Sequence, residues 1–283
     1  MKARPLLSYF VMVFAITWSI AALSLFGHGL LPKAMAHGPA SANPLFYIAV
    51  YAPAVSSLLL TAIFDGVAGL RRLAARFIPW RVGFQWYLLI LVGYPVAELI
   101  AGRVAGLFGA PQGHLPNWGQ FYYALIPALA ADPGPLGEEL GWRGFALPRM
   151  LERWKPLPAT LILGLIWGVW HLPAFFIAGL PQSHLLFLAL LLGTVSISVI
   201  DTWIFLRTNG NLLPMILVHL VINHCGKLLG IPFATTGAVG AVCVLAIVFA
   251  GGLRVPSRHR ENQRQAKQAL GAYCRTSYRM CRI

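Results

Sequence analysis

The stretch from 184 to 206 reads HLLFLALLLGTVSISVIDTWIFL, and Asp201 is its only Asp, Glu, Lys or Arg. A helix needs about 20 predominantly apolar residues to cross a bilayer. Seven other stretches have the same character, so the sequence predicts an all-α fold, a polytopic bundle of about eight transmembrane helices. The predicted spans are 5–26, 44–64, 84–108, 118–148, 157–179, 184–206, 211–228 and 233–252.

The composition agrees with a membrane protein. The chain has 283 residues, of which 58% are hydrophobic and 11% charged, whereas soluble domains carry about 25% charged residues. The net charge of +14 is spread between apolar runs and forms no single patch, which excludes nucleic acid as a partner and favours the lipid bilayer. The four cysteines show no regular spacing and indicate neither a disulfide framework nor a thiolate zinc site.

Loop charges predict the orientation of the bundle. With a cytoplasmic N-terminus, eighteen Lys and Arg residues fall in inside segments and three in outside segments, if Arg143 is set apart as intramembrane. This bias follows the positive-inside rule and predicts a multi-pass protein of the cytoplasmic membrane with both termini cytoplasmic. We expect a helical bundle at 1–253 and a basic cytoplasmic tail at 254–283. Residues 65–83 fit either an interfacial helix or a basic connector.

The fourth predicted span is interrupted by Asp132-Pro133-Gly134-Pro135. Proline removes a backbone donor and breaks or kinks a helix. Irregular backbone at membrane depth is tolerated only where protein or a polar cavity surrounds it. The sequence therefore predicts a broken helix beside a polar interior site.

A cluster of charges follows this break, in Gly137-Glu138-Glu139-Leu140-Gly141-Trp142-Arg143. Glu139 and Arg143 are four residues apart and can pair on one helix face. Glu138 points elsewhere and is then free for general base work. Ordinary solvated charges at the cytoplasmic end of a helix are the alternative interpretation.

Polar residues also interrupt two later spans, as His171 and as the pair His219 and Asn223. His219 and Asn223 share a helix face because they are four residues apart. Each could simply be a satisfied core residue or a hydrogen-bonding contact between helices. With a rise of about 1.5 Å per residue, however, Glu138, His171, His219 and Asn223 all fall in the middle band of the bilayer.

These motifs resemble those of the CPBP family, also called Abi, of CAAX-prenyl-endopeptidase and bacteriocin-processing intramembrane proteases. The family pattern is Glu-Glu-x-x-x-Arg, then aromatic-x-x-x-His, then His-x-x-x-Asn on successive membrane helices. The chain carries Glu138-Glu139…Arg143, Trp167…His171 and His219…Asn223. The second motif usually begins with Phe, so Trp167 is a departure. The resemblance covers about 118–228, the expected protease core.

The resemblance implies a cytoplasm-facing cavity and peptide-bond hydrolysis near the membrane. We expect Glu138 and His171 to activate a water, and His219 and Asn223 to stabilise the oxyanion. Glu139, paired with Arg143, would hold the helix. Glu138, His171 and His219 also form a His₂Glu set suited to zinc, but HExxH is absent, so metal-independent catalysis without a cofactor is favoured.

Two other functions remain open. One is a non-catalytic immunity or scaffold protein directed at a peptide toxin, and the other is a transporter. For a protease, the substrate could be a prenylated C-terminus, a bacteriocin-like leader peptide or another membrane-proximal peptide. The sequence assigns no role to Glu98 or Asp201.

Overall fold

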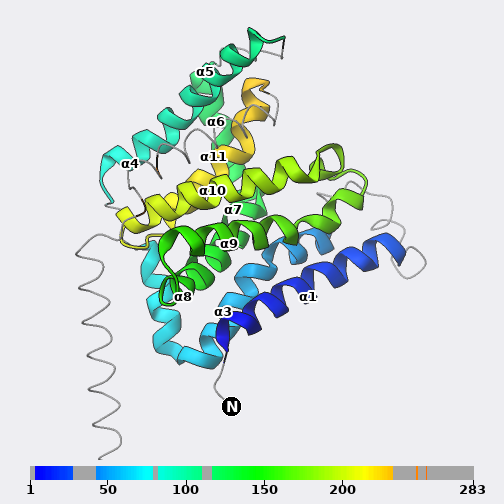
Figure 1. Cartoon of the computed structure of the whole chain (residues 1–283), viewed down its shortest axis with the longest axis vertical. Coiled ribbons are helices and arrows are strands. Elements are labelled where there is room, and N and C mark those ends of the chain that lie inside the picture. The colour runs from blue at the N-terminus through cyan, green and yellow to red at the C-terminus, as the bar shows by residue number, and fades with distance from the viewer. Residues whose placement is uncertain are drawn as a thin grey trace, which may run out of the picture.

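The computed structural model describes residues 4–27, 43–78, 82–109, 117–231, 247 and 253. Within these residues the chain is helical and has no strand, so the predicted all-α bundle is confirmed (Figure 1). The predicted eighth span, 233–252, and the tail, 254–283, lie outside the described residues except for residue 247. The count of eight spans and the cytoplasmic termini stay predictions.

The first two spans form a long antiparallel pair. Helix α1 covers Pro5–Phe26 and α3 covers Pro44–Ala74, followed by the 3-10 helix η2 at Ala75–Phe77. The two helices are joined by a hydrogen bond from the Thr17 hydroxyl to the Ala49 carbonyl, at 3.0 Å. Gly66 adopts φ 63° inside α3 and kinks it. The stretch 65–83, predicted as an interfacial helix or a connector, therefore begins with the helical residues of α3 that follow this kink.

The third span is a composite helix. It consists of α4 at Phe84–Leu88, the π-helix η3 at Leu89–Gly93 and α5 at Tyr94–Gly106.

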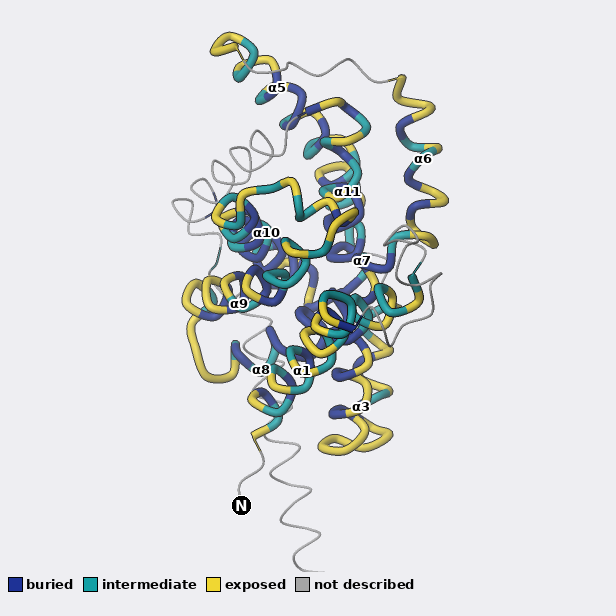
Figure 2. Tube along the Cα trace, turned by 90° about the vertical axis from the view of Figure 1, so that its right-hand side faces the viewer, coloured by how far each residue is buried: buried dark blue, intermediate teal, exposed yellow. Residues whose placement is uncertain are grey.

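The fourth predicted span is broken, as the prolines indicated. Helix α6, Trp118–Ala131, ends at Asp132, and α7, Pro133–Gly141, begins immediately afterwards. A π-helix, η4, at Trp142–Ala146 and the short α8 at Leu147–Leu151 continue the chain. Figure 2 shows α6 at the margin of the molecule, whereas α7 lies within it.

The fifth span is shorter than the predicted 157–179. Helix α9 covers Pro156–Trp170, and the chain then forms two 3-10 helices, η5 at Leu172–Phe176 and η6 at Pro181–His184. Pro173 lacks an N–H and disfavours helical backbone in the residue before it, so α9 cannot continue. The prediction of one helix to residue 179 is therefore wrong. The last two described helices are α10, Phe187–Arg207, and α11, Leu213–Leu229.

Helices α9 and α10 pack closely through small residues. A Cβ atom added at Gly164 would lie 2.6 Å from the Val195 Cα, so only glycine permits this approach. Below it, the Thr160 hydroxyl donates to the Ser198 carbonyl at 2.6 Å. Small residues and interhelical hydrogen bonds are the usual means of packing membrane helices. Figure 1 shows the two helices side by side.

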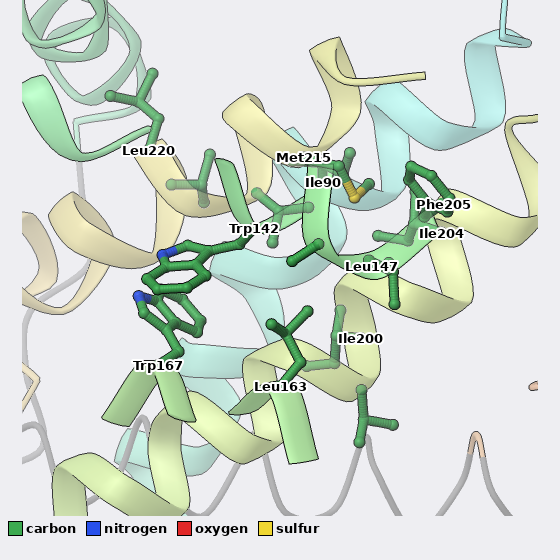
Figure 3. Close-up of a cluster of buried hydrophobic side chains, with 14 of the residues drawn as sticks. Ile90, Trp142, Leu147, Leu163, Trp167, Ile200, Ile204, Phe205, Met215 and Leu220 are labelled. Carbon is green, nitrogen blue, oxygen red and sulfur yellow. The ribbon is translucent and has the colours of Figure 1, made fainter. Parts of the chain in front are cut away.

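Burial follows the pattern expected in lipid. Within the part of the chain that the structure describes, five helical segments are long and apolar enough to cross a membrane, and α11 is a shorter apolar helix. Large apolar side chains are exposed on the outside, for example Leu188 at 65% and Ile63 at 63%, whereas Glu98, Glu139 and Arg143 are buried. An apolar exterior around buried charges is characteristic of a multi-pass membrane protein. Trp142, Trp167, Leu163 and Met215 belong to the central apolar cluster around the buried charges (Figure 3).

Candidate active site

The start of α7 brings the first polar residues into the bundle. Asp132 has extended backbone, and its Oδ1 accepts a hydrogen bond from the Gly134 N–H at 2.9 Å. Pro133 occupies the first helical position, where its missing N–H costs nothing. The break predicted from the prolines therefore ends α6 and begins a new helix inside the protein.

Glycines on α7 determine which way its carboxylates face. A Cβ atom at Gly137 would lie 3.0 Å from the Val50 carbonyl oxygen, and one at Gly141 would lie 2.5 Å from the Pro53 Cβ. This face of α7 is therefore packed tightly against α3. Glu138 and Glu139 make their contacts with α9 and α11 instead, and both are buried.

Glu139 is the centre of a buried charge cluster. Its Oε1 accepts a hydrogen bond from the Arg143 Nη1 at 2.7 Å, which confirms the pair expected from their spacing. The same oxygen lies 2.7 Å from the His219 Nδ1. Since a carboxylate only accepts, Nδ1 carries the proton, and Glu139 orients the His219 ring.

Asp201 completes this cluster from α10. Its Oδ2 lies 2.8 Å from the Arg143 Nη2, and both side chains are fully buried. The two groups meet as an ion pair without the alignment of a hydrogen bond. A buried guanidinium needs compensating negative charge, so the structure gives Asp201 the role that the sequence left open.

The π-helix η4 positions Arg143. Single turns of π-helix are rare and often mark functional sites. The Arg76 Nη1 donates to the Gly144 carbonyl at 3.2 Å and lies 3.5 Å from the Arg143 carbonyl. Arg76 thus satisfies backbone oxygens of the turn that carries the central arginine.

Glu138 is held by the aromatic residue of the second motif. The Trp167 Nε1–H donates to the Glu138 Oε2 at 2.6 Å. The face of the Trp167 ring lies 4.5 Å from the guanidinium carbon of Arg143, within the range of a cation–π interaction. Trp167 therefore contacts both Glu138 and Arg143, a role for which the sequence offered no signal beyond an unusual residue type.

His171 lies one turn after Trp167, at the end of α9. Its Nδ1 lies 2.9 Å from the Trp167 carbonyl oxygen. Since a carbonyl only accepts, this contact places the proton on Nδ1 and leaves Nε2 with a lone pair in the neutral ring. His171 can accept a proton or a hydrogen bond at Nε2.

Asn223 is oriented by a carboxylate that the sequence did not suggest for the site. Its Nδ2 donates to the Asp132 Oδ2 at 3.1 Å, and the His224 Nε2 lies 3.1 Å from the same oxygen. The sequence indicated Asp132 only as part of the helix break, and it gave His224 no role. Only the folded arrangement of α7 against α11 shows that the three meet.

One cavity is lined by all four residues that the sequence predicted to activate water or stabilise the oxyanion. Its volume is about 720 Å³, and Glu138, His171, His219 and Asn223 all line it. Gly134 lines the same space, and a Cβ atom there would lie 3.4 Å from both the His219 Nε2 and the Asn223 Nδ2. Glu139 and Arg143 are not among the lining residues and lie behind His219.

The predicted ligands of a zinc ion are Glu138, His171 and His219. Among the described residues, no group of three His, Cys, Asp or Glu side chains is gathered in a way that could hold an ion. The His₂Glu set of Glu138, His171 and His219 therefore does not have the arrangement of metal ligands here.

Comparisons with known proteins agree with the resemblance seen in the motifs. Residues 117–225 match the family model described as "Type II CAAX prenyl endopeptidase Rce1-like". A CAAX prenyl protease 2 from Methanococcus maripaludis is 30% identical over 122 residues, which are 40% of this chain and 45% of that protein. The chain thus matches less than half of the length of this relative. The matched segment runs from the start of α6 into α11 and contains all six predicted site residues.

Proposed function

We propose that this chain is an intramembrane peptidase, because residues 117–225 match the family model described as Type II CAAX prenyl endopeptidase Rce1-like. The observation that supports this most is the cavity lined by Glu138, His171, His219 and Asn223. Amide hydrolysis needs an activated water, oxyanion stabilisation and a proton for the leaving amine. The cavity brings groups suited to each task together.

In this proposal Glu138 is the general base. Trp167 occupies its Oε2, which leaves Oε1 to take a proton from a water that His171 orients through Nε2. The water oxygen attacks the carbonyl carbon, and a tetrahedral intermediate forms. Glu138 then returns the proton to the amide nitrogen as the C–N bond breaks, so protons and electron pairs balance.

Donors for the oxyanion come from α11. One N–H of the Asn223 amide is held by Asp132, so the other is free to donate into the cavity. His219, whose Nδ1 is engaged with Glu139, presents Nε2 beside Gly134 and donates from it as an imidazolium. Loss of one such donor typically costs about 10²–10³ in rate.

We propose that this chemistry needs no metal ion. The proposal is supported by the described residues, among which no three His, Cys, Asp or Glu side chains are gathered in a way that could hold an ion. The protein is purified, freed of metal by chelation and assayed for cleavage of a farnesylated CAAX peptide in parallel with untreated protein. Equal rates support the proposal. Loss of the rate on chelation, with recovery on adding Zn²⁺, would overturn it.

The proteolytic function itself is tested by comparing membrane proteomes of cells that carry the wild type, Glu138→Gln or Glu152→Gln. Glu152 is exposed at the end of α8 and serves as a matched control. We expect uncut substrates to accumulate with Glu138→Gln alone. If the Glu138→Gln cells match the wild type and the protein retains its cellular role, a binding protein such as an immunity or scaffold factor replaces the peptidase.

A further inference from the structure

We propose that Tyr9, on helix α1, is a positioning residue of the site, and that its hydroxyl binds a buried water that hydrogen-bonds to the carboxylate of Glu139. Tyr9 lies outside residues 117–225, the segment that matches the family model. The water site is argued from the structure alone, whereas its effect on cleavage rests on the peptidase function proposed above.

Tyr9 is completely buried in the bundle. It lies four residues before Val13 on α1, and both side chains have no exposed surface. The Tyr9 ring stacks on Phe145, with ring centroids 4.9 Å apart, and meets Trp142 edge-on at 5.7 Å. Both partners belong to η4. This face of α1 therefore packs against the π-turn that carries Arg143.

The Tyr9 hydroxyl reaches the backbone of α7. A Cβ atom added at Gly141 would lie 2.4 Å from the hydroxyl oxygen, so only glycine leaves this space free. Gly141 follows the carboxylate pair within one helical turn. Glu139 is the acidic side chain whose charge acts most strongly on the phenol, followed by Glu138. The hydroxyl thus lies beside the acidic motif without a direct hydrogen bond to either carboxylate.

Buried polar atoms near Tyr9 have no hydrogen-bond partner among the described residues. They include the Tyr9 hydroxyl oxygen itself, the Glu139 Oε2 and the Trp142 Nε1. A buried polar group without a partner destabilises the folded state, and within a membrane no bulk water is available to satisfy it. Ordered water bound to such groups is the usual solution in folded proteins.

The chemistry of the three atoms is complementary to one water molecule. The Trp142 Nε1–H can only donate, the Glu139 carboxylate oxygen can only accept, and the Tyr9 hydroxyl can do either. A buried water typically makes about three hydrogen bonds. It accepts from Trp142, donates to Glu139 and has Tyr9 as its third partner. In Figure 3 the indole nitrogens of Trp142 and Trp167 point to the same side, and that of Trp167 reaches Glu138.

The water holds the second oxygen of Glu139. The first, Oε1, already lies 2.7 Å from the Arg143 Nη1 and 2.7 Å from the His219 Nδ1. A carboxylate held at both oxygens cannot rotate, so the His219 ring that it orients keeps its Nε2 directed at the cavity. Tyr9 itself is not among the residues that line the cavity. It therefore acts on the reaction through Glu139 and His219.

Thermal unfolding of the full chain in detergent tests the water, with Tyr9→Phe as the variant. The substitution removes only the hydroxyl. We expect the unfolding temperature to fall by about 2–4 °C, the shift for the loss of one ordinary hydrogen bond. An unchanged or higher unfolding temperature would overturn the proposal, because removing a buried hydroxyl that has no partner stabilises the protein.

Tyr122→Phe is the matched control. It removes a hydroxyl that donates to the Leu91 carbonyl at 2.9 Å, from a residue that does not line the cavity. Its unfolding temperature should also fall, which shows that the measurement detects the loss of a single hydrogen bond of this kind. Its kcat should stay at the wild-type value.

Cleavage of the farnesylated CAAX peptide separates a positioning role from a purely structural one. We expect kcat of Tyr9→Phe to be about tenfold lower, with KM unchanged. In a His219→Gln background, Tyr9→Phe should lower the rate no further, because residues that act through one another are not additive. A wild-type rate for Tyr9→Phe, or the same tenfold loss in both backgrounds, would overturn the positioning role.

Failure of this proposal is distinguishable from failure of the peptidase function. A wild type that cleaves neither the farnesylated peptide nor any membrane protein would overturn the peptidase function and, with it, the effect of Tyr9 on cleavage. The unfolding temperatures of Tyr9→Phe and Tyr122→Phe would still decide whether the Tyr9 hydroxyl binds a water.

Discussion

The indole nitrogen of Trp167 lies 2.6 Å from a carboxylate oxygen of Glu138, although the two residues are 29 positions apart on different helices. In the family pattern that this chain resembles, the position of Trp167 is usually Phe, which has no N–H to donate. The departure from the pattern therefore coincides with a direct hydrogen bond to the proposed general base.

Replacing Trp167 with Phe isolates the effect of this hydrogen bond. The ring face that packs 4.5 Å from Arg143 is kept, whereas the N–H is lost. A hydrogen bond to a charged group contributes about 1.5–3 kcal/mol, which corresponds to a rate loss of roughly ten- to hundredfold. We expect this loss in kcat for a cleaved substrate, with little change in thermal stability.

Trp203→Phe is the matched control for that variant. Trp203 packs edge-on against Trp86, with ring centroids 5.2 Å apart, and is not among the residues that line the cavity. The control should cleave at the wild-type rate. Equal rates for both variants and the wild type would show that the Trp167 hydrogen bond does not matter for catalysis.

Asp201 supports the site through Arg143, and this predicts a loss of stability when it is neutralised. Asp201→Asn keeps the size of the side chain but removes the counter-charge 2.8 Å from the guanidinium. Removing one partner of a buried ion pair costs about 3–5 kcal/mol. We expect a clear decrease in the unfolding temperature in detergent, together with lower activity because Arg143 also holds Glu139.

The control for this measurement is Asp65→Asn. Asp65 also pairs with an arginine, Arg149, but its side chain is 32% exposed. A partly solvated pair contributes at most about 1 kcal/mol, so its loss should hardly shift the unfolding temperature. If both variants unfold at the same temperature, Asp201 has no special structural role.

The positions of the membrane helices could be predicted because apolar length is a local property. The spans predicted at 5–26 and 184–206 agree with α1 and α10 to within a few residues. The end of α9 was misplaced because residues 171–179 are as apolar as the helix before them, and hydropathy does not register the backbone restriction that Pro173 imposes. Local composition thus locates the spans better than their ends.

The site was predictable only as far as spacing within a helix allows. Glu139 and Arg143 are four residues apart, and their pairing followed from helix geometry. Asp132 and Asn223 meet across two helices at 3.1 Å. Such contacts depend on how α7 is rotated against α9 and α11, and close glycine packing against α3 determines this rotation. No periodicity within one segment encodes it.

Gly134 faces the proposed oxyanion site, so adding a methyl group there should impair catalysis without unfolding the protein. The Cβ of Gly134→Ala would lie 3.2 Å from the Asp132 Oδ1 and 3.4 Å from the His219 Nε2. It would occupy space that the carbonyl oxygen of the substrate needs. We expect a rate about 10² lower, comparable with the loss of an oxyanion donor, and unchanged or higher thermal stability, since Ala favours helix over Gly.

Gly119→Ala tests whether that effect is specific to the cavity. Gly119 also lies in the first turn of a helix, where an added Cβ would meet the Asn117 Oδ1 at 3.3 Å. It does not line the cavity. The rate should stay at the wild-type value in this variant, and an active Gly134→Ala would place the substrate carbonyl elsewhere.

Arg76 should be needed for the π-turn that carries Arg143. In Arg76→Ala the Gly144 carbonyl loses a donor at 3.2 Å, and the cation–π contact with Phe205, at 5.8 Å, is lost as well. A buried acceptor left unpaired costs about 1–3 kcal/mol. We expect a lower unfolding temperature and reduced cleavage, because η4 positions Arg143 and, through Glu139, His219.

Arg72→Ala is the control for this variant. It removes the same charge from an exposed position near the end of α3 and should leave the unfolding temperature and the cleavage rate unchanged. Should the two arginine variants behave alike, the π-turn is stable without Arg76, and its geometry then comes from the packing of Trp142 and Phe145 in the core.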